Sequence, residues 1–163
     1  VPARAGELAD QQLFREVADS HDAVVIAVPP SRTGGSHAEH TGTHQGIVDM
    51  QPAARLLVVG GAGALRAGAG LLHESPSFPQ AFKAEAVTMA KVLSIYQQGS
   101  GAIDWTMLAP PPLIAPGERT GRYVTGTDPP VGTAIPTQDF AVAALDELER
   151  PRHRGARFTV AAV

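Results

Sequence analysis

The chain reads GAIDWTMLAPPPLIAPGERTGRY at residues 101–123, and this stretch decides what fold the rest of the sequence can form. An apolar run over residues 104–108 leads directly into three prolines, and an irregular loop follows them. In open α/β sheets, the loops that leave the carboxyl ends of the strands build the ligand crevice. We therefore expect this rigid proline loop to form one wall of a cofactor or substrate site.

Two further apolar runs have the same form, because each is continuous and ends abruptly. Residues 23–28 (AVVIAV) stop at Pro29 and Pro30, and residues 55–59 (RLLVV) stop at Gly60. Strands that are apolar on both faces are typical of parallel sheets covered by helices on both sides. The three runs therefore predict buried parallel strands.

Helical segments separate these runs. Amphipathic spacing predicts helices over residues 11–19, 37–50, 82–97 and 137–149, and a short strand is expected over 157–163. Asp10 is expected to cap the first helix and Thr137 the last. Strands that alternate with helices form βαβ units, whose right-handed crossovers give a doubly wound parallel sheet. We expect one α/β domain over residues 1–163.

Composition excludes several classes of protein. Hydrophobic residues make up 44% of the 163 residues and charged ones 18%, which is typical of a globular domain with a real core. A formal net charge of −3 offers no basic stripe for nucleic acid. The chain has no cysteine, which excludes disulfides and thiol chemistry. No apolar run approaches the roughly 20 residues that span a membrane, and no secretion signal is visible, so a cytoplasmic location is expected.

The beginning of the sequence is unusual. Val1 is not a methionine, and residues 1–7 have the character of a strand. Two explanations stay open: the chain is a fragment, or the opening residues are missing from the sequence. A true fragment is expected to leave an unpaired strand edge, which would favour aggregation or pairing with another chain.

A glycine-rich turn, GGAGALR at residues 60–66, follows the second apolar run. The dinucleotide phosphate loop needs glycine at its first, third and sixth places and then a helix. Counted from Gly61, the sixth place is Arg66, and no clear helix follows. We therefore interpret the turn as a place where glycine lets the backbone approach another element closely. Such a turn can still flank a ligand.

Three histidines, His37, His40 and His44, would share one face of a helix. Metal sites use such spacing, but Gly42 weakens the helix and no acidic residue or cysteine supplies a second set of ligands. A solvated polar face is favoured, and no metal is expected. Other candidates for chemistry are equally weak. No Gly-x-Ser-x-Gly motif occurs, and the carboxylates at 146, 147 and 149 are expected on a solvated helix face.

The order of several segments resembles one known family. AVVIAV, RLLVVGGAG, FPQAFK, DWTMLAPP and IAPGERTGRY together resemble the NAD(P)H-binding, NmrA-like branch of the atypical short-chain dehydrogenase/reductases, whose bacterial members are often described as NAD-dependent epimerase/dehydratase-like. The likeness covers nearly the whole chain, and the motif at 104–123 is its most specific part. It implies a Rossmann-like fold that lacks the first strand, the phosphate loop and the second strand.

The same resemblance implies a site for NAD or NADP at the carboxyl ends of the strands. It places one pair of residues near the adenine, one group beside the ribose, the glycine turn at the next strand end and two prolines near the nicotinamide. The implied cofactor residues are Glu7, Leu8, Val28, Pro29, Pro30, Gly60, Gly61, Pro110 and Pro111. The implied substrate residues are Phe82, Lys83 and Pro112.

The chain also departs from the family. Many relatives carry a Tyr-x-x-x-Lys pair on the long helix and a serine after the glycine turn, but this chain has Phe82 and Ala64 at those places. No catalytic acid is therefore assigned. We expect an NAD(P)H-dependent reductase of a small carbonyl, quinone or flavin acceptor held by the 110–123 loop. A non-catalytic NAD(P) sensor and an interaction domain without cofactor are the alternatives. A homodimer is left open, and no nucleic acid or membrane partner is expected.

Overall fold

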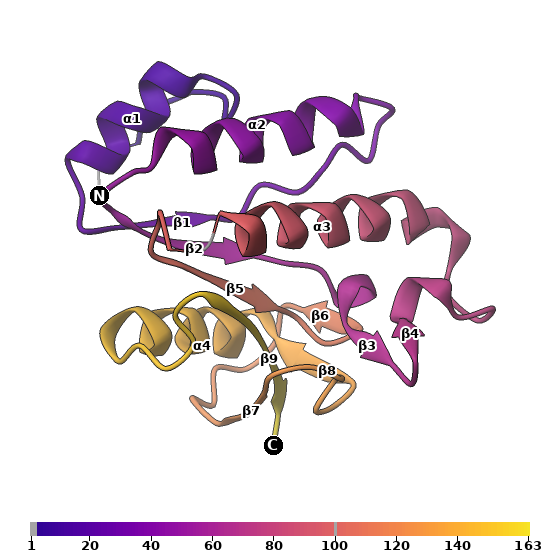
Figure 1. Ribbon diagram of the computed structural model, residues 1–163. Coiled ribbons are helices and arrows are strands. Elements are labelled where there is room, and N and C mark those ends of the chain that lie inside the picture. Colours follow the sequence, from indigo (N-terminus) through magenta and orange to yellow (C-terminus); the bar gives the residue numbers. More distant parts are fainter. Residues whose placement is uncertain (1–2, 100) are drawn as a thin grey trace.

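The computed structural model describes residues 3–99 and 101–163 and has a central five-stranded sheet in the order β1-β2-β5-β9-β7 (Figure 1). Four of its strands are parallel: β1 (Ala23–Ile26), β2 (Arg55–Val59), β5 (Trp105–Ala109) and β9 (Ala156–Ala162). The edge strand β7 (Tyr123–Gly126) is antiparallel to β9. The expected doubly wound α/β class is confirmed, and the antiparallel edge is an addition to it.

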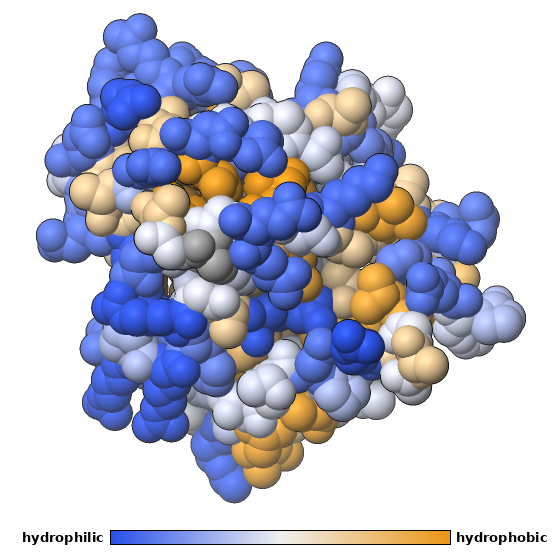
Figure 2. All heavy atoms as spheres, viewed as in Figure 1, coloured by the Kyte–Doolittle hydropathy of each residue, from blue (hydrophilic) through white to orange (hydrophobic). Residues whose placement is uncertain are grey.

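Helices cover both faces of this sheet (Figure 1). One face carries α1 (Gln11–Asp19), α2 (His37–Met50) and α3 (Gln80–Gln98), and the other carries α4 (Thr137–Glu149). The short elements are β3 (Arg66–Ala67), β4 (Gly70–Leu71), β6 (Leu113–Ala115), β8 (Ala134–Pro136), and the 3-10 turns η1 (Ala62–Ala64) and η2 (Leu72–Glu74). Viewed from the same side, the surface is largely hydrophilic, with apolar patches between the polar side chains (Figure 2).

Strand β2 shows why the sheet needs helices on both faces. Leu56 and Val58 belong to the core under α1, α2 and α3, whereas Leu57 belongs to the core under α4. All three side chains are essentially inaccessible to solvent. A strand that lies between two layers of helices buries the side chains on both of its faces. This position explains the continuous apolar sequence of β2.

Strand register brings the carboxyl ends of the strands to one edge. Ile26 of β1 is paired with Val58 of β2, and Val58 is paired in turn with Met107 of β5. The turns that begin after Ile26, Val59 and Ala109 therefore leave the sheet at the same edge. This is the arrangement that the sequence predicted for those turns.

Of the two helix caps expected from the sequence, one is confirmed and one is displaced by one residue. The Asp10 carboxylate accepts a hydrogen bond from the Leu13 amide at 3.0 Å, which confirms it as the cap of α1. The expected cap of α4 is wrong by one residue, because Pro136 holds the N-cap position and Thr137 is already helical. Pro136 already has the extended backbone that an N-cap needs.

The expected strand at the start of the chain is not present in residues 3–7, which are irregular; Val1 and Pro2 lie outside the described residues. These residues run beside α1, where Arg4 forms an ion pair with Glu16 at 3.1 Å. Among the described strands, β1 pairs only with β2, so the other edge of β1 has no described strand beside it. Within the described part of the chain, no helix is long and apolar enough to cross a membrane.

Candidate functional site

The turns that follow β1, β2 and β5 converge on one cavity, here named the carboxyl-end cavity, with a volume of about 700 Å³. Its walls come from the turns after the three strands, from the segment that precedes α3 and from the first half of α3. The lining residues lie at 27–30, 32, 59–63, 72, 75, 77–79, 82, 85, 86, 89 and 110–114. Loops at the carboxyl ends of parallel strands are the usual ligand site of such sheets. The expected convergence of the turns at 29, 60 and 110 is confirmed.

Most of the residues that the family resemblance named line this cavity. Those brought together are Val28, Pro29, Pro30, Gly60, Gly61, Phe82, Pro110, Pro111 and Pro112. Three others are not part of it: Glu7 is exposed, Leu8 packs against the core under α1, and Lys83 is exposed on α3. The binding role of each residue stays a prediction.

The cavity has an unusually apolar rim. Val28, Phe82, Leu113 and Ile114 all line it, and each leaves between 37% and 60% of its surface exposed to solvent. Exposed large apolar side chains that gather in one place typically mark a binding surface. The rim therefore suits a ligand with a flat or apolar body.

The glycine turn presses against α3. A Cβ atom on Gly63 would lie 2.4 Å from the Cβ of Ala86 and 3.0 Å from Phe78. A Cβ atom on Gly61 would lie 3.5 Å from Met89, which is ordinary contact. The interpretation of this turn as a close approach is therefore confirmed at Gly63 but not required at Gly61.

One ion pair lies on the wall of the cavity. The Arg32 guanidinium donates two hydrogen bonds of 2.7 Å to the two carboxylate oxygens of Glu85, which is on α3. Among the described residues that line the cavity, these two carry the only charged side chains. Nothing in the sequence patterns singled them out, because they lie 53 residues apart.

The loop that carries Arg32 is fastened to α3 by a second contact. His37 places Nδ1 2.6 Å from the Thr88 hydroxyl and Nε2 3.1 Å from the Ser31 carbonyl oxygen. The expected solvated histidine face is therefore wrong. His44 is fully buried against the Tyr96 hydroxyl at 3.0 Å, and burial, followed by the charge of His40, lowers its pKa to about 3. No group of three metal-ligating side chains occurs among the residues described.

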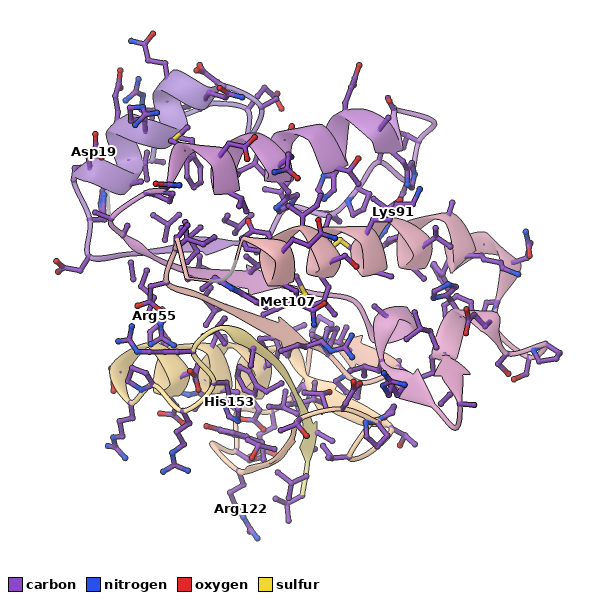
Figure 3. All side chains as sticks on the ribbon, viewed as in Figure 1. Asp19, Arg55, Lys91, Met107, Arg122 and His153 are labelled. Atoms are coloured by element: carbon purple, nitrogen blue, oxygen red, sulfur yellow. The ribbon has the colours of Figure 1, made fainter. Side chains whose placement is uncertain are left out.

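A buried ion pair lies at the opposite end of the parallel strands, beside their amino ends. Arg55, the first residue of β2, donates to Glu147 of α4 at 2.7 Å, and both side chains are more than 90% buried (Figure 3 shows Arg55 and His153 beside α4). Glu147 also accepts hydrogen bonds from the Arg152 and His153 amides and from His153 Nδ1. The expectation of a solvated Glu147 is wrong, because its partners lie far away in the sequence.

Hydrogen bonds decide the charge of Glu147. Burial alone would favour the neutral acid, but hydrogen bonds from His153, the Arg152 amide and Arg55 hold the pKa of its carboxyl below the usual value. Arg55 makes further bonds to the Glu147 carbonyl at 2.8 Å and to the Thr106 hydroxyl at 3.0 Å. The pair therefore ties β2, β5 and α4 together.

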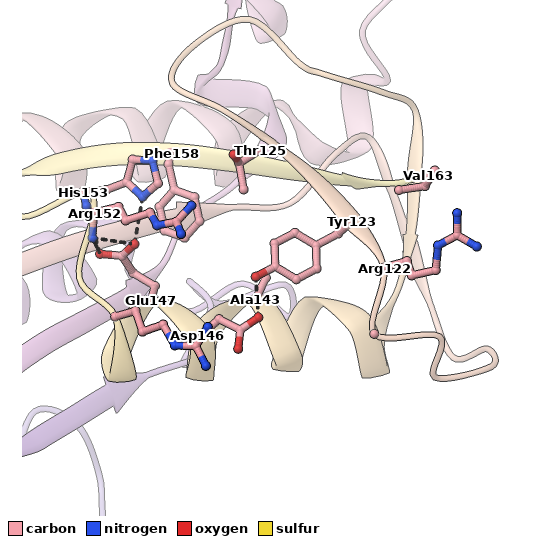
Figure 4. Close-up of a pocket in the computed structure, with 12 residues that line it drawn as sticks. Arg122, Tyr123, Thr125, Ala143, Asp146, Glu147, Arg152, His153, Phe158 and Val163 are labelled. Carbon is pink, nitrogen blue, oxygen red and sulfur yellow. Dashed lines mark hydrogen bonds and ion pairs between the residues drawn. The ribbon is translucent and has the colours of Figure 1, made fainter.

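A second cavity of about 520 Å³ lies beside α4 and β7 (Figure 4). The Tyr123 hydroxyl donates to Asp146 at 2.6 Å there, and burial together with this carboxylate raises the pKa of Tyr123 to about 12. Asp139 holds the preceding loop by accepting from the amides of Thr120 and Gly121. The expected acceptor loop over 110–123 is therefore divided, since only its first part, 110–114, lines the carboxyl-end cavity.

Comparisons with known proteins agree with this architecture. A family model described as NAD(P)H-binding matches residues 1–151. A crystal structure of a Burkholderia pseudomallei protein assigned as exported is 30% identical with a TM-score of 0.86, and the match covers 99% of this chain and 81% of that one. A Streptococcus pneumoniae TIGR4 protein assigned as an NADH-flavin reductase is 25% identical with a TM-score of 0.85, over 97% and 79% of the two chains.

A curated relative is the YwnB protein of Bacillus subtilis (strain 168), which is 42% identical over 115 residues. That match covers 65% of this chain and 54% of YwnB, so the chain spans about half the length of this relative. The comparisons confirm the resemblance drawn from the sequence and the NAD or NADP cofactor that it implies. The cytoplasmic location stays a prediction.

Proposed function

Because this chain belongs to the NAD(P)H-binding family, we propose that the protein is an NAD(P)H-dependent reductase of a small quinone, flavin or carbonyl acceptor. The observation that carries the proposal is the carboxyl-end cavity, which three strand ends build at the usual ligand position of an open parallel sheet. When bound there, the reduced dinucleotide supplies a hydride to the acceptor and is itself oxidised.

The residues present fit the nicotinamide half of such a cofactor. Gly60 and Gly61 carry no side chain at the end of β2, so a ligand can approach the backbone closely. The cavity volume of about 700 Å³ falls within the usual range of small-molecule sites. In this proposal Val28, Pro29 and Pro30 hold the ribose side, and Pro110 and Pro111 form the wall beside the nicotinamide.

The lining chemistry favours some acceptors over others. Of the described residues on the cavity wall, none is a tyrosine, lysine or histidine. Reduction of a ketone needs a proton delivered to the oxygen by a positioned acid. Quinones and flavins can take that proton from water after the hydride arrives. The chain's own role is then to orient a flat acceptor against Phe82 and Pro112 and to exclude water from its face.

A second candidate is a non-catalytic sensor of NAD(P). The absence of tyrosine, lysine and histidine from the described residues of the cavity wall supports it. A sensor would bind the dinucleotide and leave every acceptor unreduced, so the two candidates differ in turnover and not in binding.

The test uses the full-length protein. NADPH and NADH fluorescence titrations measure cofactor binding, and loss of absorbance at 340 nm measures turnover with 1,4-naphthoquinone and riboflavin. Binding with turnover is expected for a reductase. Binding without turnover would favour the sensor, and an intact protein that binds neither dinucleotide would overturn both candidates.

A matched pair of variants places the acceptor. Phe82 and Leu145 are helical and equally exposed, at 54% and 56%, but only Phe82 lines the cavity. Phe82→Ala is expected to lower kcat/KM for the acceptor by about 10-fold, the usual size of a lost apolar contact in a pocket. Leu145→Ala should leave kcat/KM unchanged, and equal effects of the two variants would argue against this cavity.

A further inference from the structure

Among the described residues that line the carboxyl-end cavity, Arg32 carries the only positive charge. Of the described residues lining the carboxyl-end cavity, Glu85 is the only other one with a charge, and the exposed rim consists of Val28, Phe82, Leu113 and Ile114. A ligand that fills this space would bring its apolar body against the rim. Of the lining residues that the structure describes, Arg32 is the one cation that an anionic group on that ligand could meet.

The Arg32–Glu85 pair can be exchanged for a ligand. The Arg32 side chain is 63% exposed and that of Glu85 is 21% exposed, so water already reaches the pair. Exposed ion pairs stabilise a protein little, because solvent screens them and long side chains lose freedom in making them. Displacing Glu85 from Arg32 is therefore a small loss, which a second anion can offset.

The geometry of the contact is suited to such an exchange. Arg32 uses Nε and one terminal nitrogen to hold both oxygens of the Glu85 carboxylate. The same planar fork matches carboxylate, sulfonate and phosphate groups. Glu85 therefore occupies the position that an anionic group of a ligand would take.

The loop around Arg32 keeps it at the cavity. The Ser31 hydroxyl accepts hydrogen bonds from the amides of Thr33 at 3.2 Å and Gly35 at 2.8 Å, and His37 contacts the Ser31 carbonyl at 3.1 Å. These contacts do not involve the guanidinium. Arg32 can thus release Glu85 while its backbone stays at the rim.

We propose that Arg32 is a specificity-determining residue that selects acceptors carrying an anionic group on a flat apolar ring system, and that Glu85 holds Arg32 in place until such an acceptor displaces it. The inference rests on the proposed function, because it assigns the acceptor class of the same cavity.

Riboflavin and FMN are the matched probes, since they share one ring system and differ by a phosphate. Titration of full-length protein saturated with oxidised dinucleotide, followed by flavin fluorescence, measures both dissociation constants without turnover. FMN is expected to bind about 5-fold or more tighter than riboflavin, the size of a charge-assisted hydrogen bond after loss of Glu85. Arg32→Gln should bring the ratio of the two dissociation constants close to 1. Glu85→Gln should strengthen the binding of FMN and leave that of riboflavin unchanged.

Arg122→Gln is the control, because Arg122 is exposed and lines the second cavity instead. Its FMN-to-riboflavin ratio should equal that of the unchanged protein. A ratio that is the same with and without Arg32, or the failure of both flavins to bind, would overturn the inference.

The proposed function is judged separately with 1,4-naphthoquinone, which carries no anionic group. Reduction of this quinone together with a ratio insensitive to Arg32 would reject only the role of Arg32. A ratio that depends on Arg32, with no reduction of any acceptor, would reject only the reductase.

Discussion

An arginine–glutamate pair lies at each end of the parallel strands, one at their carboxyl ends and one at their amino ends. The two pairs have the same closest distance of 2.7 Å. At the carboxyl ends, the side chains of Arg32 and Glu85 are 63% and 21% exposed. At the amino ends, those of Arg55 and Glu147 are 7% and 3% exposed. Contact distance therefore does not distinguish them, but burial does. The exposed pair suits exchange with a ligand, and the buried pair suits a permanent connection.

The groups that surround the two pairs also differ, because one pair is enclosed by protein and the other borders solvent. Glu147 is enclosed by amides of the turn after α4, by His153 and by Arg55, and its side chain is only 3% exposed. Glu85 has water on one side and an apolar cavity on the other. Removing one member of a buried pair leaves the other charge without compensation, whereas an exposed partner is simply solvated.

The largest expected effect follows from removing the arginines one at a time. Arg55→Met should lower the free energy of unfolding by about 3–5 kcal/mol, because the buried Glu147 charge loses its main partner. Arg32→Met should lower it by less than about 1 kcal/mol. Urea unfolding at pH 7 measures both, and equal losses would show that burial does not separate the pairs.

A glycine substitution tests how tightly the carboxyl edge is packed. Gly63→Ala should destabilise the protein by about 1–3 kcal/mol, since the added methyl group meets Ala86 and must push the turn away from α3. Gly61→Ala is the neighbouring control, with only ordinary contacts to Met89. If urea unfolding shows the two variants to be equally stable, the turn is not pressed against α3.

The pH dependence of the free energy of unfolding tests the effect of burial on a third group, His44. The folded protein keeps His44 neutral down to a pKa of about 3, whereas the unfolded chain takes up that proton near pH 6.5. The unfolded state therefore binds more protons between these values, and stability must fall as the pH is lowered. The expected loss is about 2 kcal/mol between pH 7 and pH 5.

The variant His44→Gln keeps a polar partner for the Tyr96 hydroxyl but cannot take up a proton. Its free energy of unfolding should change less over the same pH range than that of the unchanged protein. Urea unfolding at several pH values measures this. A pH dependence that survives the substitution would assign the effect to other groups.

The smallest expected effect is the coupling within the exposed pair itself. A double-mutant cycle of Arg32→Gln and Glu85→Gln should give a coupling energy below about 1 kcal/mol, and 1 M salt should reduce it further. A coupling energy of several kcal/mol that is insensitive to salt would mean that Glu85 cannot be displaced, contrary to its proposed role.

Much of the framework follows from the sequence, because its signals are local. Strand β2 and helices α1, α2 and α4 lie at the predicted residues, since continuous apolar runs and caps such as Asp10 act over a few positions. Convergence of the three strand-end turns also follows, because parallel strands end at one edge of a sheet.

What the sequence did not reveal depends on distant partners. Glu147 is buried only because Arg55, 92 residues earlier, reaches it, and His44 is buried only because α3 covers it. The Arg32–Glu85 contact spans 53 residues in the same way. One signal was available for Arg32, which follows the Pro29-Pro30 turn by two residues and so had to lie near the predicted cofactor site.

Hydrogen–deuterium exchange of the full-length protein, with and without saturating NADPH or NADH, tests the central claim most directly. Bound dinucleotide should slow amide exchange at 27–32, 60–63 and 113–114 and leave 121–125 and 150–153 unchanged. Slower exchange confined to 121–125 and 150–153, around the second cavity, would contradict the assignment of the carboxyl-end cavity.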